Sequence, residues 1–285
     1  MTTGTLVLEG GAVRGVFTAG VLDYLMEKNV CLSHVIGVSA GSCNGVDYIS
    51  HQIGRTKDCM ISRDKDFDYY QGIRKFIKEK SLLNMDMIFD KFPNELIPFD
   101  YEAYFASDIK GEWVVTNCIT GKAEYKDDRT SKEALMKICR ASSSMPLLSP
   151  MVKIGDTPYL DGGLADSIPI RRAVEIGNRK IVLVLTKNKG YRKKLVTKAG
   201  HKLYNSAYAK YPELIKTILK RPIMYNRTLE WVEKLEEQGK IFVIRPQMPL
   251  ISKIERDYDK VEEFYQHGYE QMEKQYEDLI EYLKK

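Results

Sequence analysis

Short apolar runs rich in β-branched residues recur along the chain and predict the strands of its core. Residues 5–8, 35–38, 113–118 and 180–186 form the clearest runs, and residues 241–244 form a later one. Their shortness and their lack of a helical period favour buried strands over helices.

Segments with a helical period separate the first of these runs. After residues 5–8, apolar residues recur every four positions and predict a buried helix face, which consists of Val13, Phe17, Val21 and Leu25. After residues 35–38, the inner face of a second helix is predicted to consist of Cys43, Val46, Ile49 and Ile53. Strands and helices therefore alternate, as expected of an α/β protein.

The middle of the chain predicts two hairpins. Residues 123–125 return after a turn, and residues 152–154 and 158–161 flank a second turn. A short helix follows, with Pro169 in its first turn and Gly177 at its end.

The C-terminal third is predicted to be mainly helical. Residues 203–238 have the pattern of two helices, and the tail predicts one long amphipathic helix that packs across the core. The apolar positions of this tail helix are Ile254, Tyr258, Val261, Tyr265, Met272, Tyr276, Ile280 and Leu283. Because no repeat, low-complexity tract or clear linker interrupts the chain, residues 1–285 are expected to fold as one domain.

Composition then restricts the class of protein. Of the 285 residues, 44% are hydrophobic and 29% are charged, which is typical of a folded soluble protein. The formal net charge of +5 is too small to indicate a nucleic-acid partner. It slightly favours contact with an anionic membrane surface. No segment has the character of a signal peptide or a transmembrane helix.

The five cysteines are an odd number, and no pair of them has the spacing of metal ligands. We therefore expect reduced thiols, a cytoplasmic protein and no metal site. Peripheral contact of this cytoplasmic protein with an anionic membrane surface is compatible with the same expectation.

The second apolar run ends in Gly37-Val38-Ser39-Ala40-Gly41, which has the Gly-x-Ser-x-Gly pattern of a nucleophile elbow. In such an elbow, a buried strand turns directly into a helix and exposes the serine hydroxyl at the turn. Gly37 and Gly41 lack side chains where strand and helix pass closely, and the helix N-terminus favours negative charge near Ser39. The alternative interpretation is a Gly/Ser-rich turn without chemistry.

The first strand also runs into a glycine loop, Gly10-Gly11-Ala12-Val13-Arg14-Gly15. One interpretation is a dinucleotide fingerprint, but that motif needs an acidic residue about 20 positions later, at the end of the second strand. Here the second strand ends in the serine pattern instead. We therefore prefer an oxyanion hole, in which the Gly10 and Gly11 amides stabilise a tetrahedral intermediate. A glycine turn without a ligand is the third interpretation.

A serine nucleophile needs a base, and the usual base is histidine. The histidines lie in segments that would not present them rigidly to Ser39; they are His34, His51, His201 and His267. Asp161 is the better candidate because it ends a predicted strand and is followed by Gly162-Gly163. Burial beside Ser39 would raise the pKa of Asp161 and make it a better base. The alternative interpretation is that Asp161-Gly162 is a hairpin turn without a chemical role.

Two further segments leave alternatives open. Residues 187–202 are strongly basic, which is typical of a solvated loop; contact with anionic lipid head groups is the alternative. Residues 55–110 are rich in apolar side chains that either pack on the core or form a lid or acyl-chain wall beside Ser39. These side chains are Phe67, Tyr69, Tyr70, Phe76, Ile77, Leu82, Leu83, Met85, Met87, Ile88, Phe89 and Phe92.

In their order along the chain, the glycine loop at residues 10–15, the serine elbow at residues 37–41 and Asp161-Gly162-Gly163 resemble the motifs of the patatin-like phospholipases. Residues 141–146 and 166–169 are also similar to that family's pattern. Together the three motifs are highly specific, although none is so alone.

The resemblance covers roughly residues 5–186 and implies a three-layer α/β/α fold with a mainly parallel central sheet. Residues from about 190 to 285 are similar to the helical C-terminal extension of bacterial members, packed on the core. The family also implies a Ser–Asp dyad without histidine, in which Ser39 is the nucleophile and Asp161 the base.

Other motif residues are carried over by position. Gly10, Gly11 and Ala12 match the oxyanion loop, and Arg14 matches its basic residue. The remaining motif glycines are Gly15, Gly37, Gly41, Gly162 and Gly163. Ala12 stands where some members have a third glycine, and Ser167 stands where an asparagine is common; neither departure touches the dyad.

These observations predict a serine lipid acyl-hydrolase of the phospholipase A or esterase type that acts through an acyl-enzyme. No metal or organic cofactor is implied, and the expected partner is a lipid or ester substrate. Acyl transfer from the same acyl-enzyme is one alternative, and a catalytically silent lipid-binding protein is another. The head group, the acyl length and the oligomeric state are not predicted.

Overall fold

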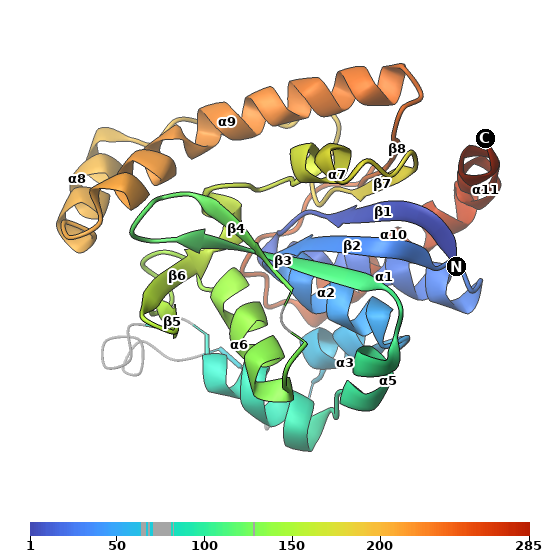
Figure 1. The fold of residues 1–285 in the computed structure, drawn as a ribbon, viewed down its shortest axis with the longest axis horizontal. Coiled ribbons are helices and arrows are strands. Elements are labelled where there is room, and N and C mark those ends of the chain that lie inside the picture. Colours follow the sequence, from blue (N-terminus) through green and yellow to red (C-terminus); the bar gives the residue numbers. More distant parts are fainter. Residues whose placement is uncertain (64–66, 68, 71–80, 82, 128) are drawn as a thin grey trace.

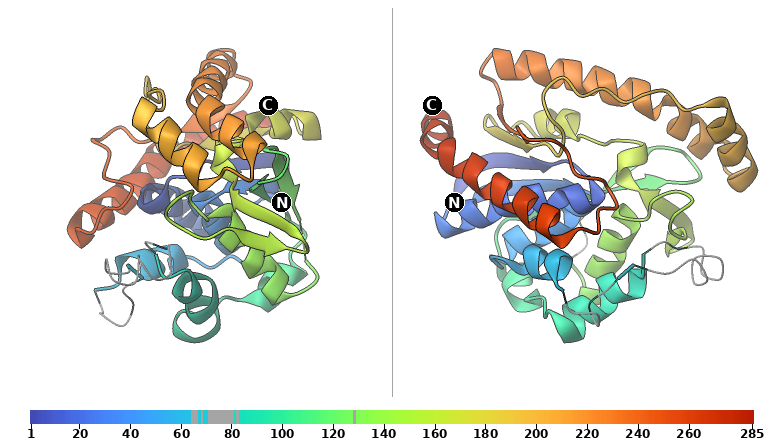
Figure 2. Two further views of the ribbon diagram at one scale, coloured as in Figure 1. Left: turned by 90° about the vertical axis from the view of Figure 1, so that its left-hand side faces the viewer. Right: turned by 180° about the vertical axis from the view of Figure 1, so that it is seen from behind.

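A computed structural model describes residues 1–63, 67, 69–70, 81, 83–127 and 129–285. Within these residues, the core is an eight-stranded mixed sheet in which neighbouring strands follow the order β5-β6-β3-β2-β1-β7-β8, with β4 also paired to β3. Helices cover both faces of this sheet, which makes a three-layer α/β/α arrangement (Figures 1 and 2). The α/β class and the mainly parallel sheet predicted above are confirmed.

The centre of the sheet is parallel, and its rim at one end is antiparallel. The parallel strands are β1 (Thr2–Leu8), β2 (Leu32–Val38), β3 (Lys110–Asn117), β7 (Ile181–Val184) and β8 (Phe242–Ile244). The antiparallel strands are β4 (Ala123–Lys126), β5 (Val152–Ile154) and β6 (Thr157–Asp161). The strands β1, β2 and β7 are apolar runs because helices bury both faces of the parallel part.

Two strands share one edge of β3. β2 runs parallel to its first part, with Val38 opposite Val114, and β6 runs antiparallel to its last part, with Asp161 opposite Val115. β4 pairs with residues 113–116 and overlaps both registers, so it occupies the other edge. β2 and β6 therefore meet end to end, and the carboxyl end of each strand lies at the junction.

Alternate side chains of the sheet enter two hydrophobic cores. Leu6 and Leu8 of β1 face one core, whereas Val7 faces the other. Helices on the first side are α1 (Gly15–Glu27), α2 (Ala40–Ile49), α3 (Arg55–Ile61), α5 (Tyr101–Ala106), α6 (Lys132–Ser142), α10 (Tyr258–Lys274) and α11 (Tyr276–Lys284). Helices on the second side are α7 (Ile170–Ile176) and α9 (Pro212–Glu237), while α8 (Lys198–Ala207) leads into α9.

Helix α1 is buried on nearly all sides because α10 covers its outer surface (Figure 2, right). Gly20 of α1 and Gly268 of α10 allow the close approach of the two backbones. A Cβ atom on Gly20 would lie 2.2 Å from the carbonyl oxygen of Tyr265, and one on Gly268 would lie 2.1 Å from that of Phe17. The four-residue face predicted for this helix is thus only part of its buried surface.

Some predicted boundaries are wrong. The tail is not one helix: α10 ends at Lys274 and α11 begins at Tyr276, while Ile254 precedes both helices and is exposed. Likewise, α2 ends at Ile49, and Ile53 lies beyond it with an exposed side chain. In both cases an apolar period continues past the point where the backbone leaves the helix, so the period alone does not mark the end.

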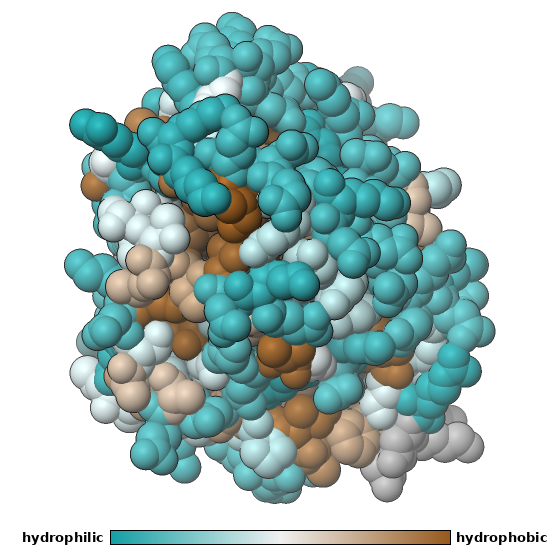
Figure 3. All heavy atoms as spheres, turned by 90° about the vertical axis from the view of Figure 1, so that its right-hand side faces the viewer, coloured by the Kyte–Doolittle hydropathy of each residue, from teal (hydrophilic) through white to brown (hydrophobic). Residues whose placement is uncertain are grey.

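Residues beyond 190 contribute to all three layers, since β8 joins the sheet, α9 covers one face and α10 covers the other. We therefore propose that the chain folds as one domain. The surface around the chain ends is mostly hydrophilic, with hydrophobic side chains in small separate clusters (Figure 3). Among the described residues, no helix combines the length and the apolar character that crossing a bilayer requires.

The contact between α1 and α10 gives a direct test of the fold. In Gly20→Ala the added methyl group collides with the backbone of α10, and we expect a loss of about 1–3 kcal/mol in the free energy of unfolding. Urea denaturation measures this loss. Gly200→Ala, in helix α8, is the control: its methyl group meets the side chain of Val196, which can move, and no backbone atom, so this variant should lose much less stability than Gly20→Ala. Equal stability of the Gly20 variant and the wild type would contradict this packing.

Candidate active site

Ser39 occupies the turn between β2 and α2. Its backbone angles, φ 55° and ψ −124°, lie in a region that residues with a side chain rarely adopt. Two glycines permit this turn. A Cβ atom on Gly37 would lie 2.5 Å from the carbonyl oxygen of Gly41, and one on Gly41 would lie 2.5 Å from that of Leu8. The predicted change from strand to helix at residues 37–41 is therefore present.

The buried side chain of Ser142 holds the Ser39 turn in place. The Ser39 N–H donates to the Ser142 hydroxyl at 2.9 Å, and that hydroxyl donates to the Val114 carbonyl oxygen at 2.7 Å. Ser142 thus connects the strained turn to β3. Its segment, residues 141–146, is similar to the family pattern, but a serine at the end of a helix carries no local signal of such a role.

Asp161 ends β6 and lies next to Ser39. The Ser39 side chain lies close enough to the Asp161 carboxyl group to lower its pKa, and Asp161 is only 7% exposed. The Gly163 N–H donates to Asp161 Oδ1 at 2.7 Å and fixes the orientation of the carboxyl group. Gly162 must lack a side chain, since a Cβ atom there would lie 2.1 Å from a carbonyl oxygen of β3.

Burial raises the pKa of Asp161 above its ordinary value. Nearby positive charge at Arg221, the Ser39 side chain, the hydrogen bond from Gly163 and the charge of Lys253 oppose this effect without cancelling it. The carboxyl group is therefore a stronger base than a solvated aspartate, while its ionised form still has partners.

The glycine loop lies against the serine turn. A Cβ atom on Gly10 would lie 2.9 Å from Ser39 Cβ, and one on Gly11 would lie 2.7 Å from Thr186 Oγ1, so neither position accepts a side chain without displacement. Ala12 has a positive φ of 51°. The N–H groups of these three loop residues donate to no acceptor in the described part of the chain. They can therefore bind an anion beside Ser39.

A buried ion pair supports this loop. Glu9 and Lys187 are 1% and 3% exposed, and Lys187 Nζ lies 2.8 Å from Glu9 Oε1. The other Glu9 oxygen accepts from the Thr186 N–H at 2.7 Å, and the Tyr225 hydroxyl donates to Oε1 at 2.7 Å. Burial alone would raise the pKa of Glu9. The positive charge of Lys187 and the hydrogen bonds from Lys187 and the Thr186 N–H outweigh this effect and hold the pKa below its ordinary value.

This ion pair corrects one prediction. Residues 187–202 do not form a uniformly solvated basic loop, because Lys187 is buried and Lys193 is half-buried. The segment ends in the helix α8. The contact between Glu9 and Lys187 joins residues 178 positions apart, so no local pattern could reveal it.

Arg14 holds a distant segment against the glycine loop. Its Nε donates to the Ile251 carbonyl oxygen at 2.7 Å, and the Val13 N–H donates to the Lys253 carbonyl oxygen at 3.2 Å. The segment between β8 and α10 therefore closes over the loop and brings Lys253 to the site.

The histidines lie elsewhere. All four are among the described residues, and none lines the cavity that contains Ser39. His34 sits at the opposite end of β2, where its Nε2 lies 3.6 Å from Glu112 Oε1. His267 accepts from the Gln247 N–H, and His201 is exposed on α8. His51 is exposed after α2.

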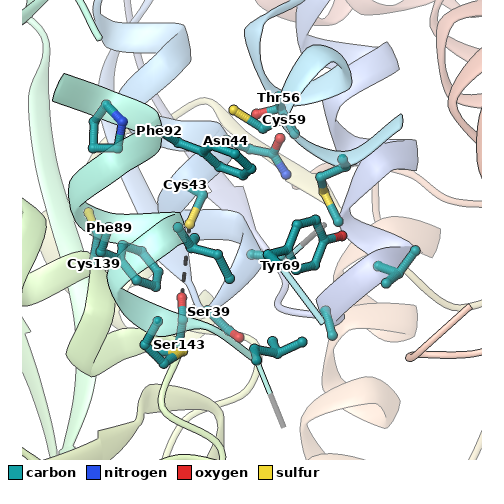
Figure 4. A pocket seen from close by; sticks show the side chains of 18 of the residues that line it. Ser39, Cys43, Asn44, Thr56, Cys59, Tyr69, Phe89, Phe92, Cys139 and Ser143 are labelled. Carbon is teal, nitrogen blue, oxygen red and sulfur yellow. Dashed lines mark hydrogen bonds between the residues drawn. The ribbon is translucent and has the colours of Figure 1, made fainter. Parts of the chain in front are cut away.

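Ser39 lines an apolar cavity of about 140 Å³ (Figure 4). Rings of Tyr69, Phe89 and Phe92 surround Cys43 in this cavity, above Ser39. From the apolar set predicted in residues 55–110, the lining residues are Tyr69, Tyr70, Leu83, Met85, Ile88, Phe89 and Phe92. Phe76, Ile77 and Leu82 lie outside the described residues. The segment thus supplies a wall of the cavity beside the serine.

Cysteines in the cavity are not competing nucleophiles. Burial raises the pKa of Cys43 to about 11, that of Cys59 to about 12 and that of Cys139 well above its ordinary value. At neutral pH all three groups stay as thiols, whose nucleophilicity is low. Within the described residues, no group of histidine, cysteine and acidic side chains could hold a metal ion.

The fold and the serine turn define an α/β protein of the hydrolase class. The model of the patatin-like phospholipase family matches residues 6–174, which is more than half of the chain. The chain therefore belongs to this family of lipid hydrolases, as the motifs predicted. A domain of unknown function, DUF6363, matches residues 211–284.

Three relatives illustrate the similarity. The uncharacterized protein YjjU of Escherichia coli is 26% identical over 254 residues, covering 87% of this chain and 69% of its own. "Probable lipid hydrolase 463L" of Invertebrate iridescent virus 6 is 23% identical and covers 82% of this chain and 89% of its own. Lysophospholipase NTE1 of the yeast Lodderomyces elongisporus is 24% identical over 92% of this chain but only 18% of its own.

The crystal structure of VipD from Legionella pneumophila has the same fold. It aligns with a TM-score of 0.52 at 13% identity over 96% of this chain and 66% of that one. At this identity the likeness supports the α/β/α architecture and nothing finer.

The ion pair under the glycine loop can be tested by a double-mutant cycle. Glu9→Gln and Lys187→Met each leave a buried partner uncompensated, and we expect each to cost about 3–5 kcal/mol in unfolding free energy. The double variant should cost less than the sum of the two because no lone charge remains. The control is Glu213→Gln, which breaks an exposed ion pair with Lys216. We expect its loss of unfolding free energy to be below about 1 kcal/mol. Single variants as mild as this control would contradict the arrangement.

Proposed function

We propose that this protein is a serine acyl-hydrolase that cleaves lipid esters through an acyl-enzyme on Ser39, with Asp161 as its base. The observation that carries this proposal is the contact between the Ser39 hydroxyl and the buried Asp161 carboxyl group. The proposal is supported by the amides of Gly10, Gly11 and Ala12 in the glycine loop beside Ser39, which donate to no acceptor among the described residues.

The reaction follows from these positions. Ser39 Oγ attacks the ester carbonyl carbon while its proton passes to the Asp161 carboxylate. The amides of Gly10, Gly11 and Ala12 stabilise the negative oxygen of the tetrahedral intermediate. Collapse of this intermediate breaks the bond to the alcohol, which leaves with the proton held by Asp161. Water then attacks the acyl-enzyme by the same route in reverse, releasing the carboxylic acid and free Ser39.

The apolar cavity supports a lipid substrate. Its lining is mainly aromatic and aliphatic and includes Ser39, so it offers an apolar place for an acyl chain. A fully polar ester would leave this surface uncovered. The names of the viral and yeast relatives, a lipid hydrolase and a lysophospholipase, agree with this substrate class.

Substitution of the two site residues tests the proposal. We expect a fluorophosphonate probe to label the wild type but not Ser39→Ala, which should have no esterase activity. Asp161→Asn should lose turnover by about 10²–10⁴-fold, because the four histidines, all among the described residues, lie outside the cavity that contains Ser39. Turnover is measured with p-nitrophenyl esters. Unchanged labelling of Ser39→Ala, or near-normal turnover in Asp161→Asn, would contradict the assignment.

The titration of Asp161 provides the control for folding. Because its pKa is raised in the fold, the carboxylate form costs stability as pH rises through that pKa. Asp161→Asn should therefore melt no lower than the wild type at pH 8, despite its low activity. In the wild type, activity should fall on acidification with an apparent pKa above 3.8, since only the carboxylate accepts the proton.

Chain-length preference tests the cavity. In Cys43→Phe the larger side chain fills the cavity next to Ser39, and we expect kcat/KM for a long-chain ester to fall at least tenfold more than that for an acetyl ester. Cys43→Ser, which keeps the volume, is the control and should keep the wild-type ratio. An equal loss for both esters in Cys43→Phe would place the acyl chain elsewhere.

A further inference from the structure

Arg221 of α9 lies beside Asp161, although it is outside residues 6–174, the part matched by the patatin-like phospholipase model. A Cβ atom on Gly163 would lie 3.2 Å from Arg221 Nη2 and 3.0 Å from Asp161 Oδ1, so both groups flank this glycine. Arg221 Nε also lies 3.4 Å from the Ser167 hydroxyl oxygen. The guanidinium group is half-buried, yet it forms no ion pair with any described carboxylate.

Two lysines lie near enough to Arg221 to be repelled by its charge. Lys253 lines the cavity that contains Ser39, and this residue is exposed to solvent. Lys193 Nζ lies 4.0 Å above the ring of Tyr225, whose hydroxyl is bonded to Glu9. Neither lysine has a carboxylate partner in the described part of the chain, in contrast to the Lys187–Glu9 pair beside them.

The crowding of these cations has an energetic cost. Partial desolvation and repulsion from Arg221 lower the pKa of Lys253 to about 8 and that of Lys193 to about 6. Asp161 and Glu9 offset this repulsion only in part, and Glu9 is already paired with Lys187. An additional anion beside the three cations would therefore stabilise the fold. Such an arrangement is typical of a site that binds an anionic ligand.

We infer that Lys193, Arg221 and Lys253 bind the phosphate group of an anionic lipid whose acyl chain occupies the apolar cavity. This inference rests on the proposed function. Lys253 lines the apolar cavity together with Ser39, and Arg221 flanks Gly163 next to Asp161, so positive charge and an apolar surface meet at this site, as the two ends of a phospholipid require. A guanidinium group binds two phosphate oxygens at once, and the ammonium groups add point charges. A zwitterionic head group would bring its own cation into this positive field, so the site should favour an anionic one.

The inference also gives a role to the C-terminal residues. Arg221 and Lys253 lie within residues 211–284, the part matched by the domain of unknown function. In this account the patatin-like part supplies the reacting groups, while the C-terminal part selects the head group.

The test uses short-chain lipids below their micelle concentration, so that attraction to a charged surface plays no part. The substrates are dihexanoyl phosphatidic acid, dihexanoyl phosphatidylcholine and a neutral p-nitrophenyl hexanoate. We expect the wild type to cleave the phosphatidic acid with at least tenfold higher kcat/KM than the phosphatidylcholine. In Lys253→Gln and Arg221→Gln, the ratio of kcat/KM for phosphatidic acid to that for the neutral ester should fall at least tenfold.

Matched controls separate the explanations. Lys220→Gln removes an exposed charge next to Arg221 on the same helix and should keep the wild-type ratio. Arg221→Lys retains the positive charge, so its ratio of kcat/KM for phosphatidic acid to that for the neutral ester should fall less than in Arg221→Gln. Because Lys253 is exposed, Lys253→Gln should fold normally. Glycerol 3-phosphate and inorganic phosphate are tested as inhibitors of neutral-ester cleavage. Both should inhibit far more weakly than a non-hydrolysable ether analogue of the phosphatidic acid.

Each failure has a distinct meaning. If the wild type cleaves esters but shows no preference for the anionic lipid, or if the variants keep the wild-type ratio, the head-group assignment is wrong and the proposed hydrolase stands. Inhibition by inorganic phosphate as strong as that by the ether lipid would indicate that the three cations bind a free anion and not a lipid head group. If the wild type cleaves no ester, the proposed function itself fails.

Discussion

One edge of β3 is shared by two strands that arrive from opposite directions. β2 ends at Val38, opposite Val114, and β6 ends at Asp161, opposite the next residue of β3. The register of each strand on β3 determines which residues lie opposite one another. The registers of β2 and β6 therefore set the distance between the Ser39 turn and the Asp161 carboxyl group. Gly162 and the Ser142 hydroxyl both contact the Val114 carbonyl oxygen, which makes this stretch of β3 the base of the whole site.

The site combines groups that would be unfavourable separately. A strained serine, a buried carboxylate and a loop whose amides donate to no acceptor in the described part of the chain each cost stability, and the buried Glu9–Lys187 pair and the glycine contacts hold them in place. Apolar side chains line the cavity that contains Ser39, and cations lie at Lys253 in the same lining and at Arg221 beside Asp161. An amphiphilic ester would cover the apolar side chains with its acyl chain and neutralise the cations with its head group.

Short-range patterns predicted the parts of this site that are built from consecutive residues. The serine turn and the glycine loop follow directly from strand endings and glycines, and Asp161 was found because it ends a strand before two glycines. Groups fixed by tertiary contacts were not predicted. Arg221 is an ordinary position within a long helix, and Lys187 looked solvated because its partner, Glu9, is remote in sequence. The end of the tail helix was missed because the apolar period runs across the break before α11.

The junction of β2 and β6 is tested most directly by a crystal structure of the protein after reaction with a long-chain fluorophosphonate. We expect phosphorus bonded to Ser39 Oγ, a phosphonate oxygen within hydrogen-bonding distance of the Gly10 and Gly11 N–H groups, and an Asp161 carboxyl oxygen within reach of Ser39 Oγ, with the alkyl chain in the apolar cavity. A histidine at that position in place of Asp161, or amides directed away from the adduct, would contradict the account.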